Sequence, residues 1–303
     1  MRAPRTRRCG SGCSVARSVR GEGRQRRAVP APAAPVGPRD AGSRRRGGAC
    51  PECTSDRGPP SGYGPRVDVQ ERFRELVAGP ESAIPLDEAA LLVAAADHPV
   101  DVAAELDALD ALAHGLVGVA TDPRSLAAAL FGDGGFTGNA GDYGDPRNSY
   151  LDEVRRRRLG IPITLSVVMI EVGRRLGIPL VGIGMPGHFL VGAGTGTGAG
   201  AGGHDDAVYI DPFHGGECFD RAGARARFER LHPGAPFVDR YLEPVGTRAV
   251  LARMLANLVA AHLARDPLRA VAPLRLRLGL PDLPPADRRQ TEAALVRLRA
   301  RMN

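Results

Sequence analysis

The sequence predicts an α+β fold in which helices surround a small antiparallel sheet. The first indication is residues 163–176, which are hydrophobic nearly all round and are followed by Gly177, a typical C-terminal helix cap. A helix of this kind lies in the middle of a domain. The second indication is three short apolar runs after it, at 180–185, 188–191 and 208–210. Turn-forming residues separate these runs, and a helix followed by a hairpin is typical of the α+β class.

Further helices are predicted on both sides of the strands. Apolar residues three and four positions apart recur through residues 67–131. Pro85 and Pro123 each begin a helix in this region, because proline suits the first helical turn. After the strands, the pattern predicts a helix at 221–231 and then three more, at 247–264, 267–279 and 286–302.

Composition divides the 303 residues into four parts. Residues 1–65 are dense in Arg, Gly and Pro and lack hydrophobic periodicity, so we expect a disordered leader. Residues 66–145 form an N-terminal helical part, and residues 146–244 form a core with the central helix and the strands. Residues 245–303 read as a helical tail of paired amphipathic helices with short turns, similar to tetratricopeptide hairpins.

The net charge of +7 comes from the leader, which holds fourteen Arg and four acidic residues. The leader therefore carries +10 and the remaining residues carry −3. A mildly acidic folded part argues against a nucleic-acid partner, apart from the basic leader itself. No apolar run approaches the roughly 18 residues of a membrane span, so we expect no membrane association. Five cysteines in a chain of this length do not indicate a disulfide framework, and we expect a cytoplasmic protein.

The leader offers one alternative to disorder. Cys9, Cys13, Cys50 and Cys53 have spacings that a zinc site permits. However, the segment between the two pairs is of low complexity and supplies no apolar residues to pack around a metal. An organellar transit peptide would need an amphipathic helix, which the frequent Gly and Pro oppose. We therefore expect neither a metal site nor a cofactor here.

Three residues of the core occupy positions that can carry chemistry. His188 begins one predicted strand, Asp211 ends its partner, and Pro162 begins the central helix. Adjacent antiparallel strands can bring the imidazole and the carboxylate side by side. The N-terminus of a buried helix supplies N–H groups and a positive dipole end, which would lower the pKa of a nucleophile placed there. This is the Cys-His-Asp layout of papain-like enzymes, with proline at the helix start instead of cysteine.

Two other residues could replace the missing nucleophile. Ser166 lies one helical turn after Pro162, about 6 Å along the axis and on the same face. A buried hydroxyl that bonds back to the Pro162 carbonyl oxygen is the structural alternative. Cys218 follows the last predicted strand and begins no helix, so nothing in its surroundings would activate it.

Several motifs follow one another in order along the chain: Tyr150–Val154, Arg158–Ser166, Arg175–Pro179, Met185–Leu190, Ile210–Gly216 and Leu251–Leu258. Together they resemble the bacterial SirB type of the transglutaminase-like superfamily. The resemblance covers about residues 70–303 and implies a transglutaminase-like core followed by a tetratricopeptide-like tail.

The resemblance also identifies what this chain lacks. In active relatives a cysteine begins the central helix about fifteen residues before the glycine of a Leu-Gly-Ile-Pro segment. Counting back from Gly177 reaches Pro162, which has no group able to attack a carbonyl. The resemblance therefore implies a degenerate site that consists of His188 and Asp211, with Ser166 nearby.

Two readings outside this layout stay open. His188, Asp211 and His214, with His204, are residue types that bind zinc or iron, although the His–Asp pair already accounts for two of them. The run Arg155–Arg158 could bind an anion or nucleic acid, although such runs are usually solvated.

The prediction is a non-catalytic regulatory or protein-binding module, and so more a pseudoenzyme than an enzyme. Its expected partner is a protein or peptide, recognised around His188 and Asp211. The alternative is an amide hydrolase or acyltransferase without cysteine, in which Ser166 acts as nucleophile with His188 and Asp211.

Overall fold

The structure is a computed structural model that describes residues 68–132, 135–194 and 207–300. All of them belong to one compact unit, Gly62–Asn303. The predicted disordered leader with its four cysteines, the glycine-rich segment 195–203 and His204 lie outside the described residues.

Four helices and one 3-10 helix of the described residues precede the first strand, β1. Aspartate side chains cap three of these helices by accepting backbone N–H bonds: Asp68 at α1, Asp101 at α3 and Asp122 at α4. The helix α2 is buried along almost its whole length, so it belongs to the core. The elements are α1 (Val69–Ala78), η1 (Glu81–Ala83), α2 (Leu86–Ala95), α3 (Val102–His114) and α4 (Pro123–Phe131).

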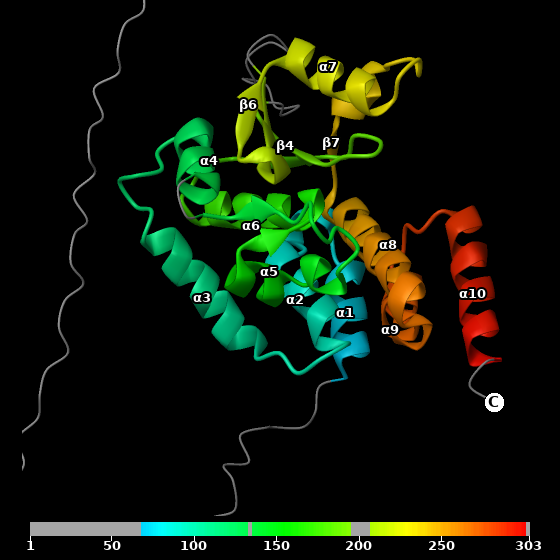
Figure 1. The fold of residues 1–303 in the computed structure, drawn as a ribbon. Helices are drawn as coiled ribbons and strands as arrows, with labels where there is room; N and C mark the ends of the chain where they lie inside the picture. Colours follow the sequence, from blue (N-terminus) through cyan, green and yellow to red (C-terminus); the bar gives the residue numbers. More distant parts are fainter. Residues whose placement is uncertain (1–67, 133–134, 195–206, 301–303) are drawn as a thin grey trace, which may run out of the picture. The chain divides into compact units, whose positions relative to one another are not determined.

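The central helix α6 (Pro162–Arg175) lies between the sheet and the N-terminal helices (Figure 1). It is buried on nearly every side, as its sequence predicts. The short strand β2 (Leu159–Gly160) leads directly into it and pairs in parallel with β1 (Thr137–Gly138). The segment between these two strands contains η2 (Pro146–Ser149) and α5 (Leu151–Arg157).

The sheet has five antiparallel strands in the order β6-β5-β4-β3-β7. The three inner strands correspond to the three apolar runs of the sequence. The sequence does not predict the two edge strands, because segments of two or three residues are too short to show an alternation of apolar and polar residues. The strands are β3 (Val181–Ile183), β4 (Leu190–Ala193), β5 (Val208–Asp211), β6 (Glu217–Phe219) and β7 (Pro244–Val245).

The two faces of the sheet pack on different layers. Val191 and Ile210 belong to the main core, which includes the apolar residues of α6. Their chain neighbours Leu190 and Tyr209 face the other way, into a smaller core beneath α7 (Arg221–Leu231). The alternation of side chains along β4 and β5 therefore produces a helix–sheet–helix arrangement, with α6 below the sheet and α7 above it in Figure 1.

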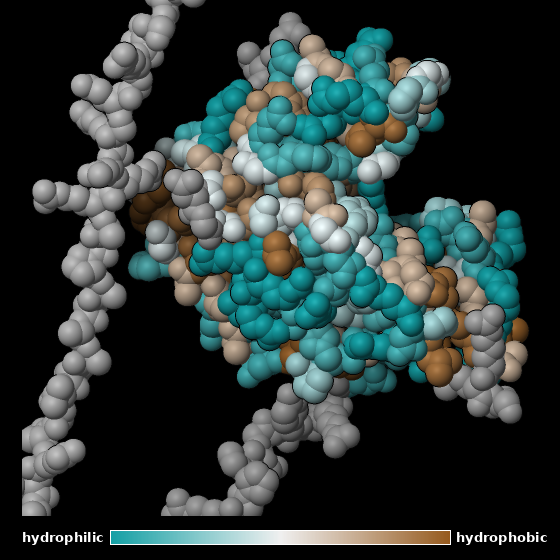
Figure 2. All heavy atoms as spheres, in the orientation of Figure 1, coloured by the Kyte–Doolittle hydropathy of each residue, from teal (hydrophilic) through white to brown (hydrophobic). Residues whose placement is uncertain are grey.

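Apart from η5, the remaining helical segments follow the last strand, β7. The first of them, α8, contributes fully buried residues to the main core, including Leu251, Leu255 and Leu258. None of the helices in the described ranges combines the length and apolar composition that a membrane span requires. Hydrophilic residues cover most of the face drawn in Figure 2. The elements from the end of α7 are η5 (Asp239–Leu242), α8 (Thr247–Arg265), η6 (Pro267–Ala270), α9 (Val271–Leu278) and α10 (Pro285–Arg299).

Candidate functional site

His188 and Asp211 lie in direct contact at one end of the sheet. Nε2 of His188 is 2.8 Å from Oδ2 of Asp211. Asp211 is the last residue of β5, and His188 precedes β4 by two residues, so the pairing of these strands brings the two together. Asp211 is fully buried, and only 5% of the His188 side chain is exposed. Because the contact uses Nε2, the other ring nitrogen of His188 is left for a second contact.

Asp211 is also the centre of a larger hydrogen-bond network. Its Oδ1 accepts the backbone N–H groups of Phe213 and His214 at 3.1 and 3.3 Å. Its Oδ2 lies 2.8 Å from Nδ1 of His214 and 3.2 Å from Nη1 of Arg227. Burial alone would raise the pKa of Asp211, but His188 and His214 together lower it below the ordinary value. The carboxylate therefore stays ionised in a dry environment.

A close backbone approach connects this network to the start of α6. A Cβ atom added at Gly138 would lie 2.5 Å from the carbonyl oxygen of Phe213. Gly138 pairs with Gly160, which precedes Pro162 by two residues. The Phe213 ring in turn packs edge-on against His188, with ring centroids 6.4 Å apart. The strands β1 and β2 thus hold the start of the central helix beside the segment that follows Asp211.

Pro162 is the first residue of α6 and is buried. Its ring has no hydrogen-bonding group. Ser166 donates its hydroxyl to the Pro162 carbonyl oxygen at 2.8 Å and is also fully buried. The sequence offered two orientations for Ser166, and the structure has the one that bonds within the helix, not the one that contacts His188.

Thr164, two residues after Pro162, connects the start of α6 to the preceding segment through hydrogen bonds. Its Oγ1 donates to the Asn148 carbonyl oxygen at 2.6 Å and accepts the Ile161 N–H at 3.3 Å. Asn148 is fully buried and donates to the Asp142 carbonyl oxygen at 2.8 Å. The segment before α6 is therefore fixed by buried polar contacts as well as by the β1–β2 pair.

Cys218 lies in the edge strand β6, opposite Ile210. Its thiol lies 3.3 Å from the Gly216 carbonyl oxygen, and burial raises its pKa. A thiol in these surroundings forms little thiolate at neutral pH, so Cys218 is poorly suited to act as a nucleophile.

His188, Asp211 and His214 offer ligand atoms that lie within 4.8 Å of one another, as a metal site would require. Arg227, on α7, opposes this use. Its guanidinium lies 3.1 Å from Nδ1 of His214 and 3.2 Å from Asp211, where a cation would have to bind. The carboxylate already has partners for both oxygens. The residues therefore fit an ion-pair network better than a metal site.

Three members of the run Arg155–Arg158 pair with acidic residues of the chain. Arg155 pairs with Glu105, Arg156 with Glu153, and Arg157 with Asp145. These charges are therefore compensated within the protein, and the surface they form gives little support to an anion or nucleic-acid site.

The sequence patterns did not identify Arg227, Tyr143 or Arg253 as members of this region. Tyr143 packs edge-on against Phe213, with ring centroids 5.9 Å apart. Arg253, on α8, donates to the carbonyl oxygen of Met185, three residues before His188, at 2.9 Å. Each of the three comes from a different part of the chain, and only the tertiary fold shows that they meet.

Comparison with known proteins shows which family the chain is similar to. Residues 100–256 match the family described as transglutaminase-like superfamily. A UPF0162 protein of Xylella fastidiosa is 38% identical over 210 residues, which are 64% of this chain and 70% of that protein. A UPF0162 protein of Vibrio cholerae is 30% identical over 132 residues, 44% of this chain and 46% of that protein.

A shorter similarity extends to eukaryotes. Human F-box only protein 21 is 38% identical over 82 residues, which are 27% of this chain and 13% of that protein. No solved structure gives a significant match.

Proposed function

Since the chain belongs to the transglutaminase-like superfamily, we propose that it is a member without the nucleophilic cysteine and acts as a non-catalytic regulatory or protein-binding module. In this proposal Pro162 occupies the position of the nucleophile. The branch is the SirB type, and its helical tail is of the tetratricopeptide-like kind. The protein acts in the cytoplasm on a protein or peptide partner.

One observation supports the proposal: the His188–Asp211 contact is present, while the first residue of α6 is Pro162, which has no nucleophilic group. The only side chains of the first helical turns with a hydroxyl are Thr164 and Ser166, and both donate to backbone carbonyl oxygens. Neither is hydrogen-bonded to His188. A base without a nucleophile cannot form an acyl-enzyme, so the pair serves recognition.

The second candidate function is an amide hydrolase or acyltransferase that uses Ser166. It is favoured only by the intact contact between His188 and Asp211, since such a pair orients an imidazole as a base. Ser166 would have to break its bond to the Pro162 carbonyl oxygen and change rotamer before His188 could activate it.

An acyl-directed activity probe distinguishes the two functions. The full chain is treated with the probe, next to the variants His188→Ala and Ser166→Ala. We expect that the probe does not label the native protein in a way that depends on His188 or Ser166. Labelling of the native protein that is lost in both variants would establish the second function and refute the first.

Restoring a thiol at the helix start tests the assignment of Pro162. In the variant Pro162→Cys, we expect a thiol pKa well below that of Cys218, because the helix dipole and His188 both favour the thiolate. The measurement is the pH dependence of iodoacetamide alkylation, resolved by peptide mass spectrometry. Adding His188→Ala should raise the pKa again.

The matched control is Pro285→Cys, since Pro285 also begins a helix, α10, but lies outside the candidate site. Its thiol should respond to the dipole alone and not to His188→Ala. If the thiol at position 162 is equally indifferent to His188, Pro162 does not occupy the nucleophile position.

A further inference from the structure

Arg253 is a cation with no carboxylate partner among the described residues. Its Nη1 donates to the Met185 carbonyl oxygen at 2.9 Å. The guanidinium carbon lies 5.4 Å from the centroid of the Phe189 ring, in a cation–π contact. Neither contact neutralises the charge, and the backbone bond uses only one of the five N–H donors of the guanidinium.

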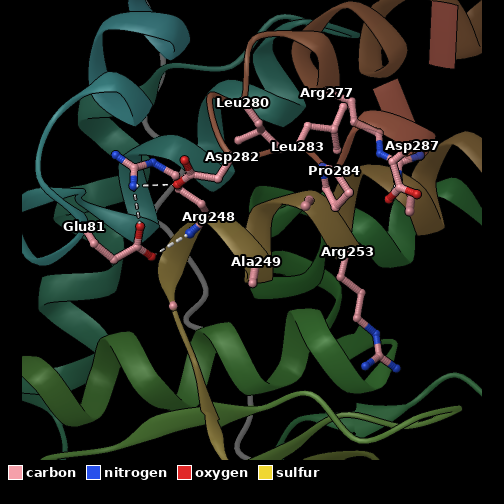
Figure 3. A pocket seen from close by; sticks show the side chains of 13 residues that line it. Glu81, Arg248, Ala249, Arg253, Arg277, Leu280, Asp282, Leu283, Pro284 and Asp287 are labelled. Carbon is pink, nitrogen blue, oxygen red and sulfur yellow. Dashed lines mark hydrogen bonds and ion pairs between the residues drawn. The ribbon is translucent and has the colours of Figure 1, made fainter. Parts of the chain in front are cut away.

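The other arginines of the same cavity are paired. Arg253 lines a cavity of about 490 Å³ together with Arg248 and Arg277. Arg248 pairs with Glu81 and Asp282, and Arg277 pairs with Asp287. In Figure 3 the Arg253 side chain extends away from these pairs. Its charge is therefore directed out of the cavity lining, toward the Met185–Phe189 segment that contains His188.

This arrangement costs stability in the free protein. The Arg253 side chain is partly buried, and burial lowers its pKa below the ordinary value, with an opposing effect of Tyr143. A desolvated cation that lacks a counterion is unfavourable unless an anion compensates it. The bond to Met185 and the contact with Phe189 satisfy part of the guanidinium but supply no negative charge, so the group can still accept an anionic partner.

Aromatic side chains connect Arg253 to His188. Burial raises the pKa of Tyr143, the positive charge of Arg253 acts in the opposite direction, and 52% of the Tyr143 surface is exposed. The Tyr143 ring packs against Phe213, and Phe213 packs against His188, at centroid distances of 5.9 and 6.4 Å. A ligand that reaches both His188 and Arg253 would therefore lie along these two rings.

We propose that Arg253, Tyr143 and Phe213 form a subsite that binds a carboxylate of a peptide held beside His188. The inference rests on the proposed function, in which this region recognises a peptide, and it names the chemical group that is recognised. A guanidinium binds a carboxylate through two parallel hydrogen bonds, and the donors that Met185 leaves unused allow this. The two rings supply apolar contact for the rest of the peptide.

Three peptides of one apolar sequence test the inference on the full chain. The first carries a glutamate side chain, the second a free C-terminal carboxylate, and the third neither, with both ends blocked. Binding is measured by calorimetry and by chemical-shift changes. We expect at least one carboxylate peptide to bind about tenfold or more tightly than the neutral peptide. The better of the two identifies the source of the carboxylate.

Two variants separate the subsite from general electrostatics. Arg253→Met should abolish the preference for carboxylate peptides. The control Arg225→Met should leave it unchanged, since Arg225 also lies over an aromatic ring, Phe237, but already pairs with Glu229. Thermal unfolding confirms that both variants are folded. If Arg253→Met does not fold, Arg253→Lys replaces it, and loss of the two-bond geometry should still weaken carboxylate binding.

Equal binding of all three peptides, no binding of any, or a preference that survives loss of Arg253 would overturn the inference. None of these results bears on catalysis. The activity-probe experiment decides the proposed function independently, because a catalytic site could also use the subsite and a non-catalytic module could lack it.

Discussion

Asp211 is the residue on which most contacts of the candidate site converge. Two backbone N–H groups, two imidazoles and one guanidinium surround a carboxylate with no exposed surface. Removing its charge would leave the buried Arg227 with Glu217 as its remaining carboxylate partner. Asp211 is therefore as important for keeping the site folded as for any chemistry of His188.

The substitution Asp211→Asn should lower the free energy of unfolding by about 3–5 kcal/mol near neutral pH, since it breaks a buried ion-pair network. The measurement is denaturant unfolding of the variant and the native protein. Asp239→Asn is the matched control. Its carboxylate pairs with Arg221 on the surface and is 80% exposed, so its loss should change stability by less than about 1 kcal/mol.

The difference between Asp211→Asn and the native protein should depend on pH. The folded protein holds the pKa of Asp211 below the ordinary value of 3.8. A lowered pKa stabilises the folded state above the unfolded value, and this stabilisation is lost as the pH falls through the folded value. The difference should therefore shrink below about pH 4. A difference that grows on acidification would mean that the site does not favour the carboxylate.

At the scale of elements, the strand β1 positions the segment after Asp211. The substitution Gly138→Ala would place a Cβ atom against the backbone and ring of Phe213. We expect overpacking to lower the free energy of unfolding by about 1–3 kcal/mol and to change the chemical shifts of His188 and His214. Gly141→Ala is the control in the same segment, because an added Cβ there meets nothing within 4 Å. Equal effects of the two variants would show that β1 does not support the site.

The sequence predicts those elements whose own residues form a long enough hydrophobic pattern. The central helix and the inner strands could be located because α6 is apolar all round and because β4 and β5 are apolar runs between turn residues. The edge strands β6 and β7 have three and two residues, too few for an alternation to be visible. Their positions depend on the strands that they join.

The residues of the candidate site also include some that the sequence can identify and some that it cannot. His188 and Asp211 could be paired in advance, since each stands at the end of a strand and those strands are neighbours. Arg227 and Arg253 could not, because their places follow from how α7 packs on the sheet and how α8 packs on the other helices. Local periodicity identifies the buried face of a helix but not the partner against which that face packs.

At the scale of the whole molecule, the helical tail is not equally attached along its length. The helix α8 belongs to the main core through Leu251, Met254 and Leu255, which are fully buried. By contrast, α10 contributes Leu295 and Leu298 to a small separate apolar cluster. The first helix therefore completes the core, while the last adds a local layer.

Two truncations should separate these roles. A chain that ends at Gly246 loses α8 and Arg253 and should not fold, since the exposed core would lack a large part of its apolar contacts. A chain that ends at Pro284 loses only α10 and should unfold cooperatively at a reduced temperature. Circular dichroism and thermal unfolding measure both. A cooperative transition in the shorter chain would show that the core folds without the tail, and the peptide subsite would then be an addition to a complete domain and not a part of it.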